Sequence, residues 1–261
     1  MRAESDYNQT MLVRIFFLIF SIAITTLPAL AEEASGNEAR ETMVRLQSLL
    51  RSDTNTARYT MTVKTSEWER SITMDSWDDR PGKRFFIRVI EPVKDRDTTY
   101  LKLGPNLWMY LPKLERDIRI PPSMMLSSWM GSDFTNDDLV KAASVVDDYH
   151  HSLTSHADGT VTVVSIPKAY APVVWGKLVH VIRADGIPLS EDFYDEHGNK
   201  KRSMKFENVK EMDGRTIPTR WVMLPQDDPE KRTILQIDAI EFDPKIDDSV
   251  FTRANLKRRG R

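Results

Sequence analysis

The sequence predicts a mainly β protein of the α+β class, built on one strongly curved antiparallel sheet of about 11–13 strands. Apolar and polar residues alternate with a period of two along most of the chain, as in half-buried strands. Turn signals recur about every eight to fifteen residues. Helical patterns are few and do not recur between strands, which argues against parallel βαβ packing.

The first part of the chain has the features of an export signal. Arg14 precedes the apolar run 15–27, which is too short for a comfortable membrane span. Ala29 and Ala31 then occupy the small-residue positions of a signal-peptidase site. We therefore predict a cleavable signal peptide over residues 1–31, with an uncleaved membrane anchor as the alternative.

The remainder, residues 32–261, is predicted to be a single exported, soluble domain. The 261-residue sequence contains no cysteine, so stability must come from an ordinary core and lipid attachment at a lipobox is excluded. A net charge of −2 argues against a nucleic-acid binder. Either Met1 or Met11 serves as the start, because residues 11–31 alone make a conventional leader. The terminal "KRRGR" is predicted to be a solvated basic end.

The clearest helix is residues 38–51, "EARETMVRLQSLLR". Ser35 and Glu38 have the spacing of a capping box before it. Its apolar stripe consists of Ala39, Met43, Leu46 and Leu50.

Strands are predicted over most of the remaining chain. The first, residues 56–65, alternates cleanly, and His197-Gly198-Asn199 signals a hairpin. The other predicted strand regions are 83–91, 98–104, 106–112, 115–121, 159–167, 173–186, 188–210, 216–224 and 232–242.

A sheet of this size exposes a broad apolar face that must be covered. A second sheet would give a sandwich or a closed barrel. The alternative is a curled sheet whose concave face is plugged by helices. The helical segments available for such a plug are residues 38–51 and the neighbourhood of 123–144.

The sequence offers no positive sign of catalysis or of a cofactor. His150 and His151 are adjacent in an extended segment and point to opposite faces, so no histidine metal site is expected. Paired acids such as Asp78/Asp79 adjoin turns, where aspartate caps and solvates. Nucleophile-elbow and phosphate-loop motifs are absent. The chain is therefore predicted not to be an enzyme.

An unusual segment lies at residues 119–139, "RIPPSMMLSSWMGSDFTNDDL". Four of the 12 methionines lie between Met109 and Met130. Methionine fills irregular gaps and is over-used on surfaces that accept varied apolar partners. Core filling and ligand binding are both open at this point.

Residues 107–139, "LWMYLPKLERDIRIPPSMMLSSWMGSDFTNDDL", resemble the signature of the LolA-like outer-membrane lipoprotein-sorting proteins. The matching elements are W-x-Y-x-P, which begins at Trp108, and W-M-G-S-D-F…D-L, which begins at Trp129. The resemblance implies an unclosed antiparallel β-barrel whose concave side is covered by helices, with an apolar cavity between them.

The resemblance also implies a function. A periplasmic carrier would bind the acyl chains of a lipoprotein, a free lipid or a glycolipid. An inner-membrane ABC or RND-type transporter would load it, and an outer-membrane acceptor would receive the cargo. A lipid-sensing regulatory module of the RseB type on the same fold is the alternative.

Two groups of residues follow from this interpretation. Residues 122–135 are predicted to move to admit cargo. Within this segment Gly131 is predicted as a local hinge, with a simple turn glycine as the alternative, and Asp133 as the cap of a helix that begins near Thr135. The predicted cavity residues are Tyr59, Met61, Val63, Phe85, Ile87, Val89, Trp108, Tyr110, Met124, Met125, Trp129 and Met130.

Overall fold

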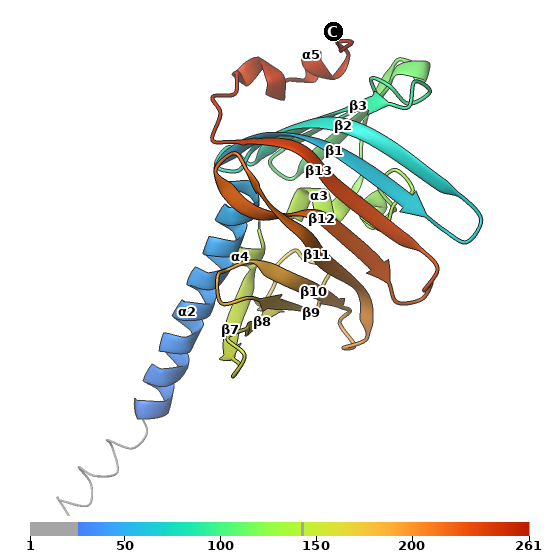
Figure 1. Cartoon of the computed structure of the whole chain (residues 1–261). Helices are drawn as coiled ribbons and strands as arrows, with labels where there is room; N and C mark the ends of the chain where they lie inside the picture. The colour runs from blue at the N-terminus through green and yellow to red at the C-terminus, as the bar shows by residue number, and fades with distance from the viewer. Residues whose placement is uncertain (1–25, 142–143, 261) are drawn as a thin grey trace, which may run out of the picture.

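A computed structural model describes residues 26–141 and 144–260, with side chains described from residue 36 onward. In this part of the chain thirteen strands form one antiparallel sheet that curls without closing (Figure 1). The prediction of a mainly β, unclosed sheet is confirmed. The predicted signal peptide lies largely in residues 1–25, outside the described residues.

The element bounds are as follows. The strands are β1 Thr54–Lys64, β2 Glu69–Asp79, β3 Arg84–Glu91, β4 Thr99–Leu103, β5 Asn106–Leu111, β6 Arg116–Arg119, β7 Tyr149–Ser155, β8 Val161–Pro167, β9 Lys177–Ile182, β10 Pro188–Tyr194, β11 Lys200–Met212, β12 Arg215–Pro225 and β13 Arg232–Phe242. The α-helices are α2 Thr26–Arg51, α3 Asn136–Lys141, α4 Val145–Asp148 and α5 Arg253–Leu256, and the 3₁₀ turns are η1 Pro112–Leu114, η2 Pro122–Met124 and η3 Asp248–Phe251.

The sheet consists of two meanders joined at its centre. Strand order is β6-β5-β4-β3-β2-β1-β13-β12-β11-β10-β9-β8-β7, so the first and last strands of the sequence are neighbours in the middle. Met61 of β1 lies opposite Leu235 of β13. The two edges, β6 and β7, are joined in sequence by η2, α3 and α4. This connection therefore has to pass beneath the curled sheet, where it covers the concave face.

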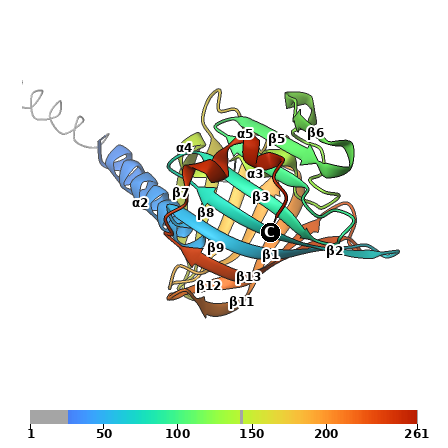
Figure 2. The same cartoon turned by 90° about the horizontal axis from the view of Figure 1, so that it is seen from above.

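Helix α2 covers the other part of the concave face. Ala39, Met43 and Leu46 are buried, and Leu50 packs partly against the same cluster, which confirms the predicted stripe. The helix begins at Thr26, so Ser35 lies within it and does not cap it. Its first turns extend away from the sheet in both views (Figures 1 and 2).

Two strands were not singled out in the sequence. Strand β2 carries the alternation Ile72, Met74, Ser76, but it ends in Asp78 and Asp79, which suggest a turn. Strand β7 contains the two histidines and few apolar residues. Both pair along their whole length with a neighbour, and this pairing determines their conformation more than their composition does.

The convex face of β3, β4 and β5 is also buried. Residues 246–256 lie across it (Figure 2), and Phe251 and Leu256 pack against Phe86 and Leu101. The Arg84 guanidinium lies 4.4 Å from the centre of the Phe251 ring, within the range of a cation–π contact. This end of the sheet is therefore apolar on both faces.

Residues 257–260 of the basic terminus are exposed, as expected of a solvated end, but hydrogen bonds to the sheet also hold the backbone. Arg88 donates to the carbonyls of Arg258 and Asn255, and the Gly260 N–H donates to Asp97 at 2.8 Å. The Arg88 guanidinium therefore anchors the backbone that follows α5 to β3.

Within the described residues, no helix combines the length and the apolar character needed to cross a membrane.

Truncating Phe251 tests the cover of the convex face. Phe251 is 4% exposed, so Phe251→Ala should lower the free energy of unfolding by about 3–5 kcal/mol. Tyr170 is 103% exposed, and Tyr170→Ala should change it by less than about 0.5 kcal/mol. Urea unfolding measures both variants. Equal, small effects would show that the C-terminal segment is not part of the folded core.

Candidate functional site

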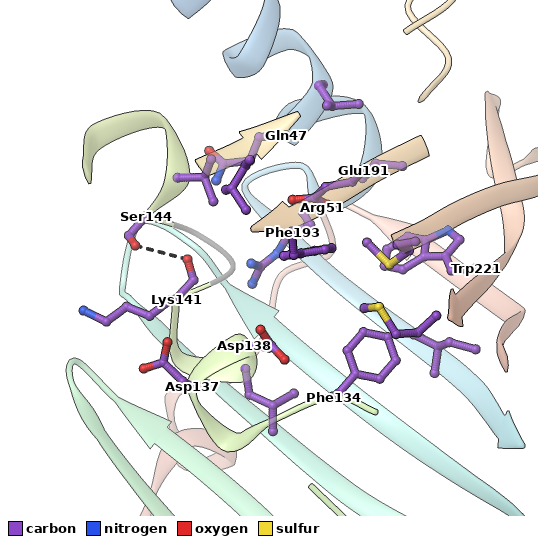
Figure 3. Close-up of a pocket in the computed structure, with 18 of the residues that line it drawn as sticks. Gln47, Arg51, Phe134, Asp137, Asp138, Lys141, Ser144, Glu191, Phe193 and Trp221 are labelled. Atoms are coloured by element: carbon purple, nitrogen blue, oxygen red, sulfur yellow. Dashed lines mark hydrogen bonds between the residues drawn. The ribbon is translucent and has the colours of Figure 1, made fainter. Parts of the chain in front are cut away.

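A cavity lies between the concave face of the sheet and its helical cover. Its volume is about 330 Å³, within the range of small-molecule pockets. Helices α2, α3 and α4 form one wall, and strands β1–β3 and β9–β13 form the other. Figure 3 shows Phe134, Arg51, Glu191, Phe193 and Trp221 around this space.

The walls are mainly apolar because each strand alternates apolar and polar residues, and the apolar residues of neighbouring strands lie opposite one another on the concave face. Leu178 lies opposite Phe193, and Met204 lies opposite Met223, all on the concave face. The aromatic residues pack edge to face, with ring centres 5.3 Å apart for Trp175–Phe193 and 5.6 Å apart for Phe206–Trp221. Further apolar lining residues are Met43, Leu46, Leu50, Val145, Val146, Val173 and Leu235.

Arg202 connects the sheet to the helical cover. Its guanidinium donates to both carboxylate oxygens of Asp138 at 2.8 and 2.5 Å and to the Asp133 carbonyl at 2.7 Å. It also lies 4.5 Å from the Trp175 ring centre and 4.4 Å from that of Phe193. The Arg202 side chain is 6% exposed, so this ion pair is desolvated and depends on both partners.

A second ion pair lies where α2 ends. Arg51 donates to both carboxylate oxygens of Asp78 on β2, at 2.8 and 2.7 Å. Asn55 donates to the Arg51 carbonyl at 2.8 Å. This arrangement satisfies the last turn of α2 and ties the C-terminal end of the helix to β2.

A third polar group occurs on β9 and β10. His180 lies directly opposite Glu191, and both line the cavity. The distance from His180 Nδ1 to Glu191 Oε1 is 3.8 Å. Burial raises the pKa of Glu191 to about 8 and lowers that of His180 to about 3. Both groups are therefore mainly uncharged at neutral pH.

Within the described residues, no cluster of three or more histidine, aspartate or glutamate side chains is arranged to hold a metal ion.

The structure brings only some of the predicted cavity residues to the cavity wall. Tyr59, Phe85, Ile87 and Trp129 line it. The others on the concave side lie beside it: Met61 and Val89 belong to the adjoining buried cluster, Met125 and Met130 pack against that cluster, and Val63 is buried.

Three predicted residues lie elsewhere. Met124 is 47% exposed. Trp108 and Tyr110 pack beneath the C-terminal segment on the convex face, whereas Leu107 and Met109 of the same strand face inward. The period of two is present in β5, but both faces of this strand are apolar. Composition alone therefore does not determine which set of residues faces the cavity.

The helix cap predicted at Asp133 is supplied by other residues. Thr135 and Asp138 cap α3 reciprocally: the Thr135 N–H donates to Asp138 at 2.7 Å, and the Asp138 N–H donates to Thr135 Oγ1 at 3.2 Å. Asp133 instead accepts from Thr233 at 2.7 Å and lies 2.8 Å from Lys231, so it ties the loop to β13. Gly131 has a φ of +77°, as a turn glycine does. Whether residues 122–135 move stays a prediction.

Sequence reasoning missed the lining residues on β9–β12. The strands themselves were predicted, and their inward residues were visible as one phase of the alternation. The sequence does not show which alternate set of residues faces inward, or which strands the helices cover. Both became clear only because α2, α3 and α4 lie over these strands. The Met-rich segment stands out in the sequence by its apolar composition. Glu191 and His180 are polar residues in alternating strands, where polar residues usually face solvent.

Comparison with known proteins identifies the family. A family model described as "Uncharacterized protein" matches residues 82–258, more than half of the chain. The chain belongs to this family. No curated protein matches the sequence.

Solved structures show that this family member has the LolA-like fold. A DUF1329 family protein from Desulfovibrio piger is 20% identical with a TM-score of 0.76, over 85% of this chain and 99% of that one. A putative outer membrane lipoprotein-sorting protein domain from Vibrio parahaemolyticus is 21% identical, with a TM-score of 0.72 over 87% and 100%. A LolA superfamily protein from Nitrosomonas europaea is 18% identical, with a TM-score of 0.70 over 83% and 98%. At these identities the likeness establishes the fold, and the predicted LolA-like architecture is confirmed.

Removing the Arg202 guanidinium tests the ion pair with Asp138 that connects β11 to α3. Arg202→Met leaves the carboxylate of Asp138 buried without its partner and should cost about 3–5 kcal/mol of unfolding free energy. The double variant Arg202→Met/Asp138→Asn removes the unpaired charge and keeps a side chain able to cap α3. It should therefore be more stable than the single variant in urea unfolding. Equal stabilities would show that the two charges are not coupled.

The pH dependence of stability tests the environment of Glu191. The pKa of its carboxyl rises from 4.5 to about 8 on folding, so the folded state holds a proton that the unfolded state releases between these pH values. This contribution to stability is complete below pH 4.5 and is lost as the pH rises through 8. Glu191→Gln should therefore gain stability relative to wild type between pH 5 and pH 8. A constant difference across this range would contradict the assignment.

Proposed function

We propose that this protein is a non-enzymatic periplasmic carrier that binds the acyl chains of a lipoprotein or lipid in its apolar cavity. The observation that supports the proposal best is an apolar cavity held open between a curved sheet and helices α2, α3 and α4. The signal peptide predicted over residues 1–31 supports export to the periplasm. The LolA-like fold, shared with a putative lipoprotein-sorting domain, supports the cargo class.

The energetics of such a cavity suit transfer between membranes. Burying an acyl chain is worth about 0.8 kcal/mol per methylene. A cavity with apolar walls therefore binds an acyl chain about as favourably as a bilayer does. It can release the chain to a site that binds the chain more tightly. The chain carries no nucleotide-binding motif, so loading is assigned to an inner-membrane ABC or RND-type transporter, and delivery to an outer-membrane acceptor.

The polar ties described above would control access to the cavity. Arg202–Asp138 and Lys231–Asp133 both connect the segment between β6 and β7 to the sheet. Opening by movement of residues 122–135 would have to break the second tie. We propose that docking of a partner protein breaks it.

A series of fluorescent acyl probes with C10 to C16 chains tests the binding step. Each buried methylene should lower the Kd about fourfold, until the chain fills the cavity. Leu235→Trp, which fills part of the cavity, should weaken binding of the C16 probe at least about tenfold. Ile166→Trp places the same side chain at a 46% exposed position and should leave the affinity unchanged. Failure to bind any probe would refute the proposed cavity function.

Transfer of the bound probe to acceptor vesicles distinguishes a carrier from a sensor. A carrier should deliver the C16 probe to vesicles at a rate that rises with vesicle concentration. A protein that binds the probe but never releases it to vesicles or to an outer-membrane extract would instead fit the sensing alternative.

A further inference from the structure

Two polar side chains face each other in the wall of the cavity without forming a hydrogen bond. His180 and Glu191 are directly paired across β9 and β10. The 3.8 Å between His180 Nδ1 and Glu191 Oε1 exceeds hydrogen-bonding distance. The two groups therefore lie close enough to contact one small ligand group together, but too far apart to satisfy each other.

Both side chains are buried with hydrogen-bonding capacity unused. They are 5% and 14% exposed, respectively. His180 Nε2 is buried and has no partner among the described residues, and the Glu191 carboxyl makes no hydrogen bond within the same part of the chain. Unsatisfied buried polar groups reduce stability, so apolar residues here would favour folding. The pair therefore has no evident role in holding the fold together.

The residues that follow the pair across the adjoining strands of the concave face are apolar. Val163 lies beyond His180 on β8, and Met204 and Met223 lie beyond Glu191 on β11 and β12. A few polar groups in an otherwise apolar wall are the usual source of orientation and specificity in ligand pockets. This wall places one such polar position within the path of an apolar ligand.

The protonation states determine which ligand group fits. With the pKa of Glu191 raised and that of His180 lowered by burial, the pair offers a carboxyl O–H donor and an imidazole nitrogen acceptor at neutral pH. A hydroxyl group accepts one hydrogen bond and donates one, and so complements both. An anionic headgroup would find no positive charge on this pair.

The other charged and titratable groups near Glu191 are already engaged. Arg202 on β11 is bonded to Asp138 of α3, and Asp192 of β10 is bonded to Lys200 at 2.7 Å. The Tyr149 hydroxyl on β7 donates to the Trp175 carbonyl at 3.1 Å.

We propose that His180 and Glu191 form a subsite that binds one uncharged hydroxyl group on the apolar part of the amphiphile held in the cavity. The inference rests on the proposed function and narrows its ligand class to hydroxylated acyl chains or other apolar molecules with an internal hydroxyl. An unsubstituted chain would occupy the same cavity but leave the pair unsatisfied.

Competition between hydroxylated and plain fatty acids tests the subsite. Stearic acid and its 3-, 10- and 12-hydroxy derivatives would each displace a fluorescent C16 probe from the purified protein. At least one hydroxy isomer should bind about tenfold more tightly than stearic acid, because its hydroxyl is matched by the pair. If stearic acid binds and no isomer binds more tightly, the subsite is refuted while the carrier proposal stands. If no fatty acid binds, the proposed function fails and the subsite with it.

Three variants separate recognition by the pair from a general effect on the cavity. Glu191→Gln keeps an uncharged donor and acceptor and should retain the preference for the hydroxy isomer. Glu191→Met and His180→Leu should lose the preference, measured as the ratio of the affinities for the hydroxy isomer and for stearic acid in the same variant. Thermal unfolding confirms that each variant is folded. Loss of the preference in Glu191→Gln, or its persistence in both apolar variants, would overturn the proposal.

The pH dependence of the preference gives a second readout. In the wild type the preference should change between pH 7 and pH 9, because the Glu191 carboxyl loses its proton and can then only accept a hydrogen bond from the hydroxyl. In Glu191→Gln it should stay constant over this range. A parallel change in both proteins would assign the effect to another group and contradict the proposal.

Discussion

The structure depends on one constraint: the concave face of a thirteen-stranded sheet must be shielded from water without being completely filled. A closed barrel of this size would need no helical cover, and a sandwich would leave no cavity. The unclosed sheet instead receives helix α2 on one side and the β6–β7 connection on the other. Because α2 and the short helices α3 and α4 do not fill the whole curve, an apolar space stays between them and the strands.

Two ion pairs position the helices of the cover, α2 and α3, on the sheet. Apolar packing is less directional and specifies their positions less well. Arg51–Asp78 fixes the end of α2, and Arg202–Asp138 fixes the start of α3. Both are bidentate and largely buried, so they specify geometry more than they add stability. Both arginines also line the cavity.

The two arms of the sheet are used differently. The arm of β3, β4 and β5 is buried on both faces, because the C-terminal segment covers its convex side. The arm of β9–β12 presents apolar side chains to the cavity. Both arms nevertheless contribute to the cavity wall, since Phe85 and Ile87 of β3 line it as well. The buried His180–Glu191 pair lies in the second arm, where unsatisfied polar groups reduce folding stability but can select a ligand.

The sequence by itself determined the fold class, most strands, the apolar stripe of α2 and the family resemblance, because each is a local pattern of alternation, spacing or motif. The tertiary structure decided which face of each strand meets the cavity. Trp108 and Tyr110 face outward because the distant residues 246–256 cover them. Glu191 and His180 became site residues only through the pairing of β9 with β10 beneath the helical cover. These residues are buried by segments that are far away in the sequence, so a local sequence pattern cannot predict their burial.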